Sequence, residues 1–176
     1  MINVTKTFLP NKQKLLKYID SIYENGWVTN HGPLVKELEE KLAAYLGVKH
    51  IVLVSNGTAA LEIAYRALNV TGSAITTPFS FVATTSSLVT NGITPVFCDI
   101  NPETLNIDET KIISLIQEDT SAIVPVHTFG NPCNIEAIAR ISNRHNLRLI
   151  YDACHTFNVT SNRKNILNFG DILQSN

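Results

Sequence analysis

A short polar segment at residues 55–58, Ser-Asn-Gly-Thr, joins an apolar run to a segment of helical pattern. The first backbone N–H groups of a helix have no partner within it, and the positive end of the helix dipole lies behind them. Gly57 lets an anion approach the backbone closely, and the Thr58 hydroxyl can donate a further hydrogen bond. The segment is neither a Walker A loop nor a GxGxxG fingerprint. It predicts a phosphate site; the alternative is a side-chain-capped helix with nothing bound.

Two further polar residues, Asp152 and His155, follow the last clear apolar run, residues 147–151. A carboxylate there can bind a protonated ring nitrogen of a cofactor. For a pyridine ring, this contact keeps the nitrogen cationic and makes the ring an electron sink. His155 could contact the same ring. The alternatives are a carboxylate that caps the next turn and a hydrogen-bonded interior histidine.

Phe81 lies shortly after the apolar run 74–77, and a planar ring could stack on its side chain, although core aromatics show the same pattern. In parallel α/β sheets, ligands bind at the carboxyl ends of the strands. This rule selects the residues that follow each run: 55–58, 78–81, Asp99, His127, Asp152 and His155. We therefore expect the chemistry of the protein at that edge of the sheet.

Short apolar runs alternate with helical segments along the chain, and these are the strands and helices that must position the residues above. The runs are 51–54, 74–77, 95–98, 122–126 and 147–151, and the helical segments between them are 58–68, 82–90, 109–117 and 135–145. Most runs lack polar alternation, so both faces of the sheet should be covered. The pattern predicts an α/β protein with three layers, α/β/α, around a mostly parallel sheet. Two more helices precede it, one at 12–24 and one that begins at Pro33 and ends at Gly47.

The composition indicates a soluble globular chain: of 176 residues, 44% are hydrophobic and 16% charged, with a net charge of −1. The lack of a basic excess argues against nucleic acid as a partner, and no apolar run is long enough for a membrane span. No signal peptide is recognisable, so we expect a cytoplasmic protein. Cys98, Cys133 and Cys154 form no CxxC pair, so we expect neither a metal site nor disulfides, but small buried side chains.

Taken together, the motifs resemble those of the DegT/DnrJ/EryC1/StrS sugar aminotransferases. The resemblance extends in order and spacing over nearly the whole chain, and its motifs are residues 26–33, 55–61, 77–84, 95–100, 106–108, 124–132 and 151–155. Residues 75–78 and 130–133 are similar to those of members that act on dTDP-4-keto-6-deoxyhexoses.

The resemblance implies a fold-type-I transferase that depends on pyridoxal 5'-phosphate (PLP). Residues 1–176 would form the N-terminal part of its large domain, without the small C-terminal domain. Such an enzyme would move an amino group from glutamate to a keto group of a nucleotide-linked sugar, for lipopolysaccharide, capsule or antibiotic sugars, and would be a homodimer. The residues carried over are Gly57 and Thr58 for the cofactor phosphate, Asn56 as a further cofactor-binding residue, Phe81 for ring stacking, Asp152 for the ring nitrogen, His155 beside the ring, and Thr29 and His127 for the substrate.

The sequence departs from the family pattern at its C-terminus. The Schiff-base lysine of the family follows a segment similar to residues 169–173, but this sequence ends at Asn176. Lys49 and Lys164 do not replace it, because the first lies at the wrong end of the sheet and the second in a polar loop. We therefore assign no catalytic residue, and we expect at most non-covalent cofactor binding and no transamination from these 176 residues alone.

Two other interpretations of the sequence remain open. In dehydratases of the same family a histidine replaces the lysine, and a phosphate- or nucleotide-binding α/β module would use only the turn at Gly57 and Thr58. The resemblance also implies a mixed sheet in which two later strands separate residues 51–54 from residues 147–151. We therefore expect a gap beside a loosely attached strand 51–54, and a chain of marginal stability.

Overall fold

The computed structural model describes residues 6–175, which form two compact units. The first unit comprises residues 6–45 and 50–53, and the second comprises residues 46–49 and 54–175. The candidate site lies wholly in the second unit.

Two helices account for most of the first unit: α1 is Lys12–Asn25, and α2 is Pro33–Leu46, whose last residue belongs to the second unit. The Asn11 side chain caps α1 by accepting a hydrogen bond from the Lys14 amide. At the other end, Gly26 has a φ of 64°, a left-handed conformation that suits glycine and ends the helix. Both helices confirm the sequence prediction.

The predicted strand at 51–54 is wrong: these residues form no strand and pair with none in the described part of the chain. The side chain of Val52 is 72% exposed. The Leu53 amide donates to the Glu39 carboxylate at 2.8 Å, so a side chain takes the place of a neighbouring strand. A strand needs such a neighbour for its backbone groups, and sequence pattern alone cannot supply one.

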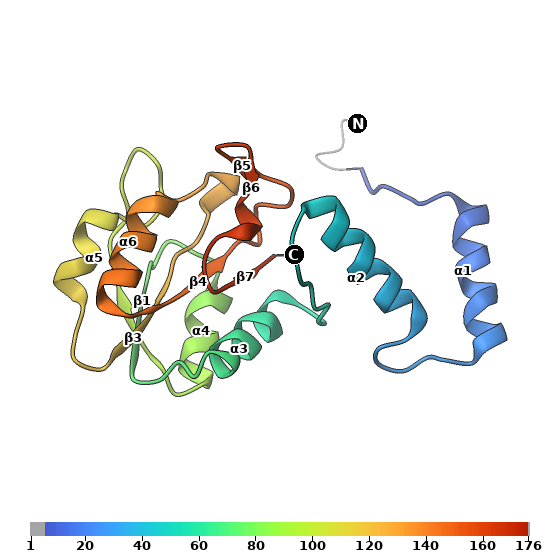
Figure 1. Cartoon of the computed structure of the whole chain (residues 1–176), viewed down its shortest axis with the longest axis horizontal. Coiled ribbons are helices and arrows are strands. Elements are labelled where there is room, and N and C mark those ends of the chain that lie inside the picture. The colour runs from blue at the N-terminus through green and yellow to red at the C-terminus, as the bar shows by residue number, and fades with distance from the viewer. Residues whose placement is uncertain (1–5, 176) are drawn as a thin grey trace. The chain divides into compact units, whose positions relative to one another are not determined.

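A parallel sheet of five strands forms the centre of the second unit, in the order β2-β1-β3-β4-β7 (Figure 1). Its strands are β1 (Ser73–Thr76), β2 (Thr94–Phe97), β3 (Thr120–Val124), β4 (Arg148–Asp152) and β7 (Ile172–Gln174). Each neighbouring pair is parallel. The first four of these strands confirm the prediction to within about one to two residues at most ends, and β7 was not predicted.

Helices cover both faces of this sheet. They are α3 (Gly57–Ala67), α4 (Val82–Thr90), α5 (Glu109–Leu115) and α6 (Ile135–His145), with short 3₁₀ turns η1 (Thr128–Gly130) and η2 (Ile166–Asn168). Ile123 and Tyr151 pack in one core with Ile138 of α6. Their chain neighbours Val124 and Ile150 pack in the other, with α3 and α4, because successive strand side chains point to opposite faces. The three-layer α/β/α prediction is confirmed.

The connection from β4 to β7 contains a hairpin rather than a long helix. Its strands are β5 (Thr160–Ser161) and β6 (Lys164–Asn165), joined by two residues with positive φ. Gly170, with a φ of 84°, then brings the chain close to β4, since a Cβ there would lie 3.0 Å from the Leu149 carbonyl oxygen. The Asp171 amide bonds that same carbonyl and starts the pairing of β7. None of the helices in the described part of the chain is long and apolar enough to cross a membrane.

Candidate functional site

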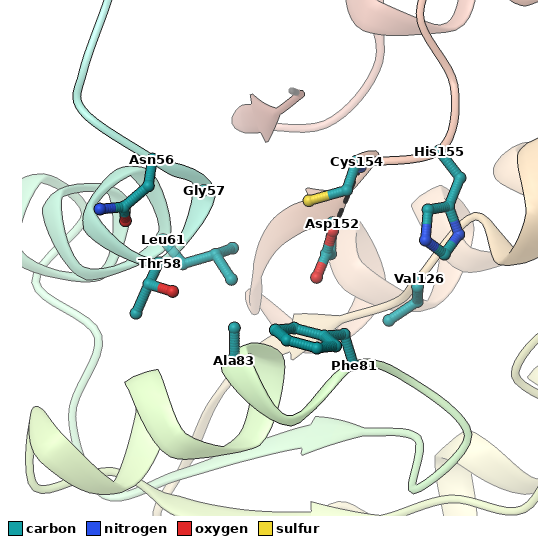
Figure 2. A pocket seen from close by; sticks show the side chains of 10 residues that line it. All are labelled: Asn56, Gly57, Thr58, Leu61, Phe81, Ala83, Val126, Asp152, Cys154 and His155. Atoms are coloured by element: carbon teal, nitrogen blue, oxygen red, sulfur yellow. Dashed lines mark hydrogen bonds between the residues drawn. The ribbon is translucent and has the colours of Figure 1, made fainter. Parts of the chain in front are cut away.

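A pocket of about 230 Å³ lies at the carboxyl ends of β3 and β4, beside the first turns of α3 and α4 (Figure 2). Ten residues line it: Asn56, Gly57, Thr58, Leu61, Phe81, Ala83, Val126, Asp152, Cys154 and His155. It therefore brings together all six residues that the sequence predicted for the cofactor, from three separate segments of the chain.

The first turn of α3 presents two unpartnered backbone amides to this pocket. Asn56 is the N-cap, and its side-chain oxygen accepts a hydrogen bond from the Ala59 amide at 2.9 Å. Within residues 6–175, the amides of Gly57 and Thr58 have no hydrogen-bond partner. Donors at this turn for an anion are these two amides, the Thr58 hydroxyl and the Nδ2 group of Asn56, which donates to the Ser55 hydroxyl at 3.3 Å.

Asp152 ends β4 as a carboxylate that is only 5% exposed. Its Oδ2 accepts a hydrogen bond from the Thr84 hydroxyl at 2.7 Å, and its Oδ1 accepts one from the Cys154 amide at 3.3 Å. No ion pair within residues 6–175 includes it. A buried carboxylate is costly without a cationic partner, so this group is suited to a ligand that brings a positive charge or an N–H donor.

The backbone around Asp152 is held in place by the segment that follows β3. The Asp152 amide donates to the Pro125 carbonyl at 2.9 Å, and the His127 amide donates to the Asp152 carbonyl at 3.0 Å. These bonds extend the parallel pairing of β3 and β4 beyond the regular strands. They fix the point from which the carboxylate enters the pocket.

Two aromatic rings flank the carboxylate. Phe81 immediately precedes α4, is 72% exposed and lies beside Asp152 in Figure 2. His155 lies on the side of the pocket away from Thr58, and its ring stacks on Phe129 at 6.1 Å between centroids. Its Nδ1 accepts a hydrogen bond from the Phe129 amide at 3.3 Å, which leaves the proton of the neutral ring on Nε2 as a donor.

Cys154 also lines the pocket, which the sequence analysis did not predict. Burial raises the pKa of its thiol to about 11, and the charge of Asp152 adds to this effect. The thiol is therefore neutral near pH 7, and it contacts the Gln174 side chain at 3.0 Å. Thr84 was missed as well, because 68 residues separate it from Asp152 and only the folded chain brings the two together.

The two predicted substrate-binding residues are not among those that line the pocket. His127 is fully buried: its ring stacks on Tyr151 at 4.6 Å, and its Nδ1 accepts a hydrogen bond from the Cys133 amide at 3.0 Å. Burial lowers its pKa to about 4, so the ring is neutral near pH 7. His127 thus does not line the pocket in the described structure, and its role in substrate binding stays a prediction. Thr29 is exposed and belongs to the first unit, so its role stays a prediction.

Comparison with known proteins decides the family. Residues 10–174 match the model of the DegT/DnrJ/EryC1/StrS aminotransferase family. The chain belongs to this family. The resemblance seen in the sequence motifs is thereby confirmed.

Two curated relatives illustrate how close the similarity is. The chain is 49% identical to a dTDP-4-amino-4,6-dideoxy-D-glucose transaminase of Escherichia coli, over 90% of this chain and 43% of that protein. It is also 49% identical to a protein of the same name from Shigella dysenteriae, over 97% of this chain and 47% of that protein. The chain thus spans about half the length of the curated relatives it matches.

Two solved structures agree with the fold. A crystal structure of DesI, determined in the presence of its TDP-sugar product, matches 92% of this chain and 41% of that protein with a TM-score of 0.88 and 35% identity. NtdA from Bacillus subtilis, with bound cofactor PMP, matches 98% of this chain and 41% of that protein with a TM-score of 0.82 and 30% identity.

Proposed function

We propose that the protein is a PLP-dependent aminotransferase that moves an amino group from glutamate to a keto group of a nucleotide-linked sugar. The proposal rests on one observation: two groups suited to different parts of a cofactor lie in the same pocket. At one end are the unpartnered amides of Gly57 and Thr58, and at the other is the buried carboxylate of Asp152 without a cation. A phosphate and a protonated ring nitrogen on one rigid cofactor would satisfy both ends.

The chemical types of the pocket residues match the parts of this cofactor. Gly57 and Thr58 would hold the phosphate, with the dipole of α3 behind them. Asp152 would keep the ring nitrogen protonated, and Phe81 would stack on the ring. When bound, PLP acts as an electron sink for the bonds around the amino carbon of a substrate. His155 would donate from Nε2 to an acceptor at the ring edge, while its Nδ1 stays engaged by the Phe129 amide.

The substrate class rests on the relatives. The E. coli and Shigella proteins are named for a dTDP-linked 4-amino-4,6-dideoxyglucose, and DesI was crystallised with its TDP-sugar product. We therefore propose a dTDP-4-keto-6-deoxyhexose as the amino acceptor. A homodimer that works in the cytoplasm and supplies amino sugars to a cell-surface polysaccharide is part of the same proposal.

The test is an amination assay with the protein as the cell makes it, supplied with PLP, glutamate and a dTDP-4-keto-6-deoxyhexose. Transfer of the amino group leaves 2-oxoglutarate and converts the sugar carbonyl to an amine, so we expect both products in equal amounts. Loss of water from the sugar without 2-oxoglutarate would instead indicate a dehydratase. Binding of the cofactor without either reaction would contradict the proposed substrate.

A further inference from the structure

The carboxylate of Asp152 is held by a side chain to which the proposed chemistry assigns no role. Thr84, in the first turn of α4, is fully buried, and its hydroxyl lies 2.7 Å from Oδ2. A carboxylate has no proton to donate, so the Thr84 hydroxyl must be the donor. This bond is short and buried, whereas the second bond to Asp152, from the Cys154 amide, is long at 3.3 Å. The threonine is therefore the stronger of the two restraints on the carboxylate.

Thr84 is itself fixed by hydrogen bonds on both sides. Its amide donates to the Phe81 carbonyl at 3.1 Å, and its own carbonyl accepts from the Ser87 hydroxyl at 3.2 Å. The Ser87 hydroxyl lies 3.4 Å from that of Tyr65, a buried residue of α3. Ser87 thus reaches Thr84 through the backbone carbonyl, while the hydroxyl of Thr84 bonds Asp152. Thr84 also joins the backbone of Phe81 directly to the carboxylate.

We propose that Thr84 is a positioning residue that acts on the cofactor through Asp152; this rests on the proposed function. A carboxylate has about four lone-pair directions, and the two bonds described occupy one on each oxygen. The remaining directions then have a defined orientation for the ring nitrogen. The short hydrogen bond from Thr84 therefore holds the carboxylate in the orientation that the ring nitrogen meets.

The test compares two ligands on three variants. Pyridoxamine phosphate has the ring nitrogen, and its 1-deaza analogue has a C–H group in its place. With Thr84→Val, which keeps the shape of the side chain and removes the donor, we expect affinity for pyridoxamine phosphate to fall about tenfold. Affinity for the deaza analogue should change little, because that ligand makes no bond to Asp152. Thr84→Ser, which restores a hydroxyl, should recover most of the loss.

Thr85→Val is the matched control, since it makes the same chemical change one residue further along α4, where the side chain is only half-buried and has no hydrogen bond within residues 6–175. It should leave both affinities unchanged. Equal weakening of both ligands by Thr84→Val would show a purely structural role and overturn the proposal. Full affinity of Thr84→Val for pyridoxamine phosphate would overturn it too. If the wild-type protein bound neither ligand, the proposed function itself would fail, a result distinct from the other two.

Discussion

The hydroxyl of Thr58 is a side-chain donor at the anion end of the pocket, next to the two backbone amides of Gly57 and Thr58. We expect Thr58→Val to weaken binding of pyridoxamine phosphate about tenfold, because a hydrogen bond to a charged group is worth roughly 1.5–3 kcal/mol. Binding of pyridoxamine, which lacks the phosphate, should not change. Calorimetric titration of both ligands checks this, and equal losses for the two would place the phosphate elsewhere.

His127 gives a prediction for stability against pH. Burial lowers its pKa from 6.5 to about 4, so the unfolded chain binds a proton on this ring between these values while the folded chain does not. The neutral ring therefore costs the folded state nothing above pH 6.5. As the pH falls from 6.5 to 4, protonation of the unfolded chain lowers the free energy of unfolding by about 3 kcal/mol. Urea unfolding at several pH values checks this. Between pH 6.5 and 4, the free energy of unfolding should fall less steeply for His127→Phe than for the wild type.

Phenylalanine at position 127 can keep the stacking on Tyr151 but cannot titrate. The variant also loses the acceptor for the Cys133 amide, so it will be less stable at every pH. The comparison therefore concerns how steeply the free energy of unfolding changes with pH, not its absolute value. His31→Gln, at an exposed position, is the control and should follow the wild-type slope. Parallel curves for wild type and His127→Phe would contradict the assignment of a buried neutral ring.

At the scale of the elements, β7 depends on the close approach of Gly170 to β4. We expect Gly170→Ala to destabilise the protein, because its φ of 84° strains any L side chain and the new methyl group would meet Leu149 and Tyr151 at 3.0 Å. Gly92→Ala separates the two causes, since Gly92 has a φ of 72° but open space around it. The free energy of unfolding should fall by about 1 kcal/mol for Gly92→Ala and by roughly 1–2 kcal/mol more for Gly170→Ala. Equal losses would mean that the contact with β4 is loose.

Most elements of the second unit could be predicted from the sequence because their signals are local. The buried strands are apolar and rich in β-branched residues, and α3 follows the polar segment with Asn56 as its cap. The converging positions at the strand ends follow from the geometry of parallel sheets, which is why Phe81, Asp152 and His155 were found together.

The elements and contacts that were missed depend on information outside any short window. β7 has only three residues, and its pairing with β4 relies on the turn at Gly170 and Asp171. Residues 51–54 have the composition of a strand, yet pairing needs a neighbour, which composition does not reveal. His127 follows β3 like a site residue, but the chain turns its ring into the core against Tyr151.

At the scale of the whole molecule, the sheet has an ordered centre and an unpaired outlying segment. In a polypeptide of these 176 residues, the amides of β1, β3 and β4 should exchange slowly with solvent, since they lie in the middle of the sheet. The amides of Val52 and Val54 should exchange quickly, because no strand pairs with them in the described structure. Hydrogen exchange with residue resolution checks this, and slow exchange throughout 51–54 would show that the segment finds a partner strand.

The central claim is that the pocket between α3, α4 and β4 holds a phosphorylated pyridine cofactor in one orientation. A crystal structure of the protein with pyridoxamine phosphate tests it most directly. The account predicts the phosphate within hydrogen-bonding distance of the Gly57 and Thr58 amides, the ring nitrogen against the carboxylate of Asp152, and the ring stacked on Phe81. A phosphate bound away from the first turn of α3, or a ring nitrogen directed away from Asp152, would contradict it.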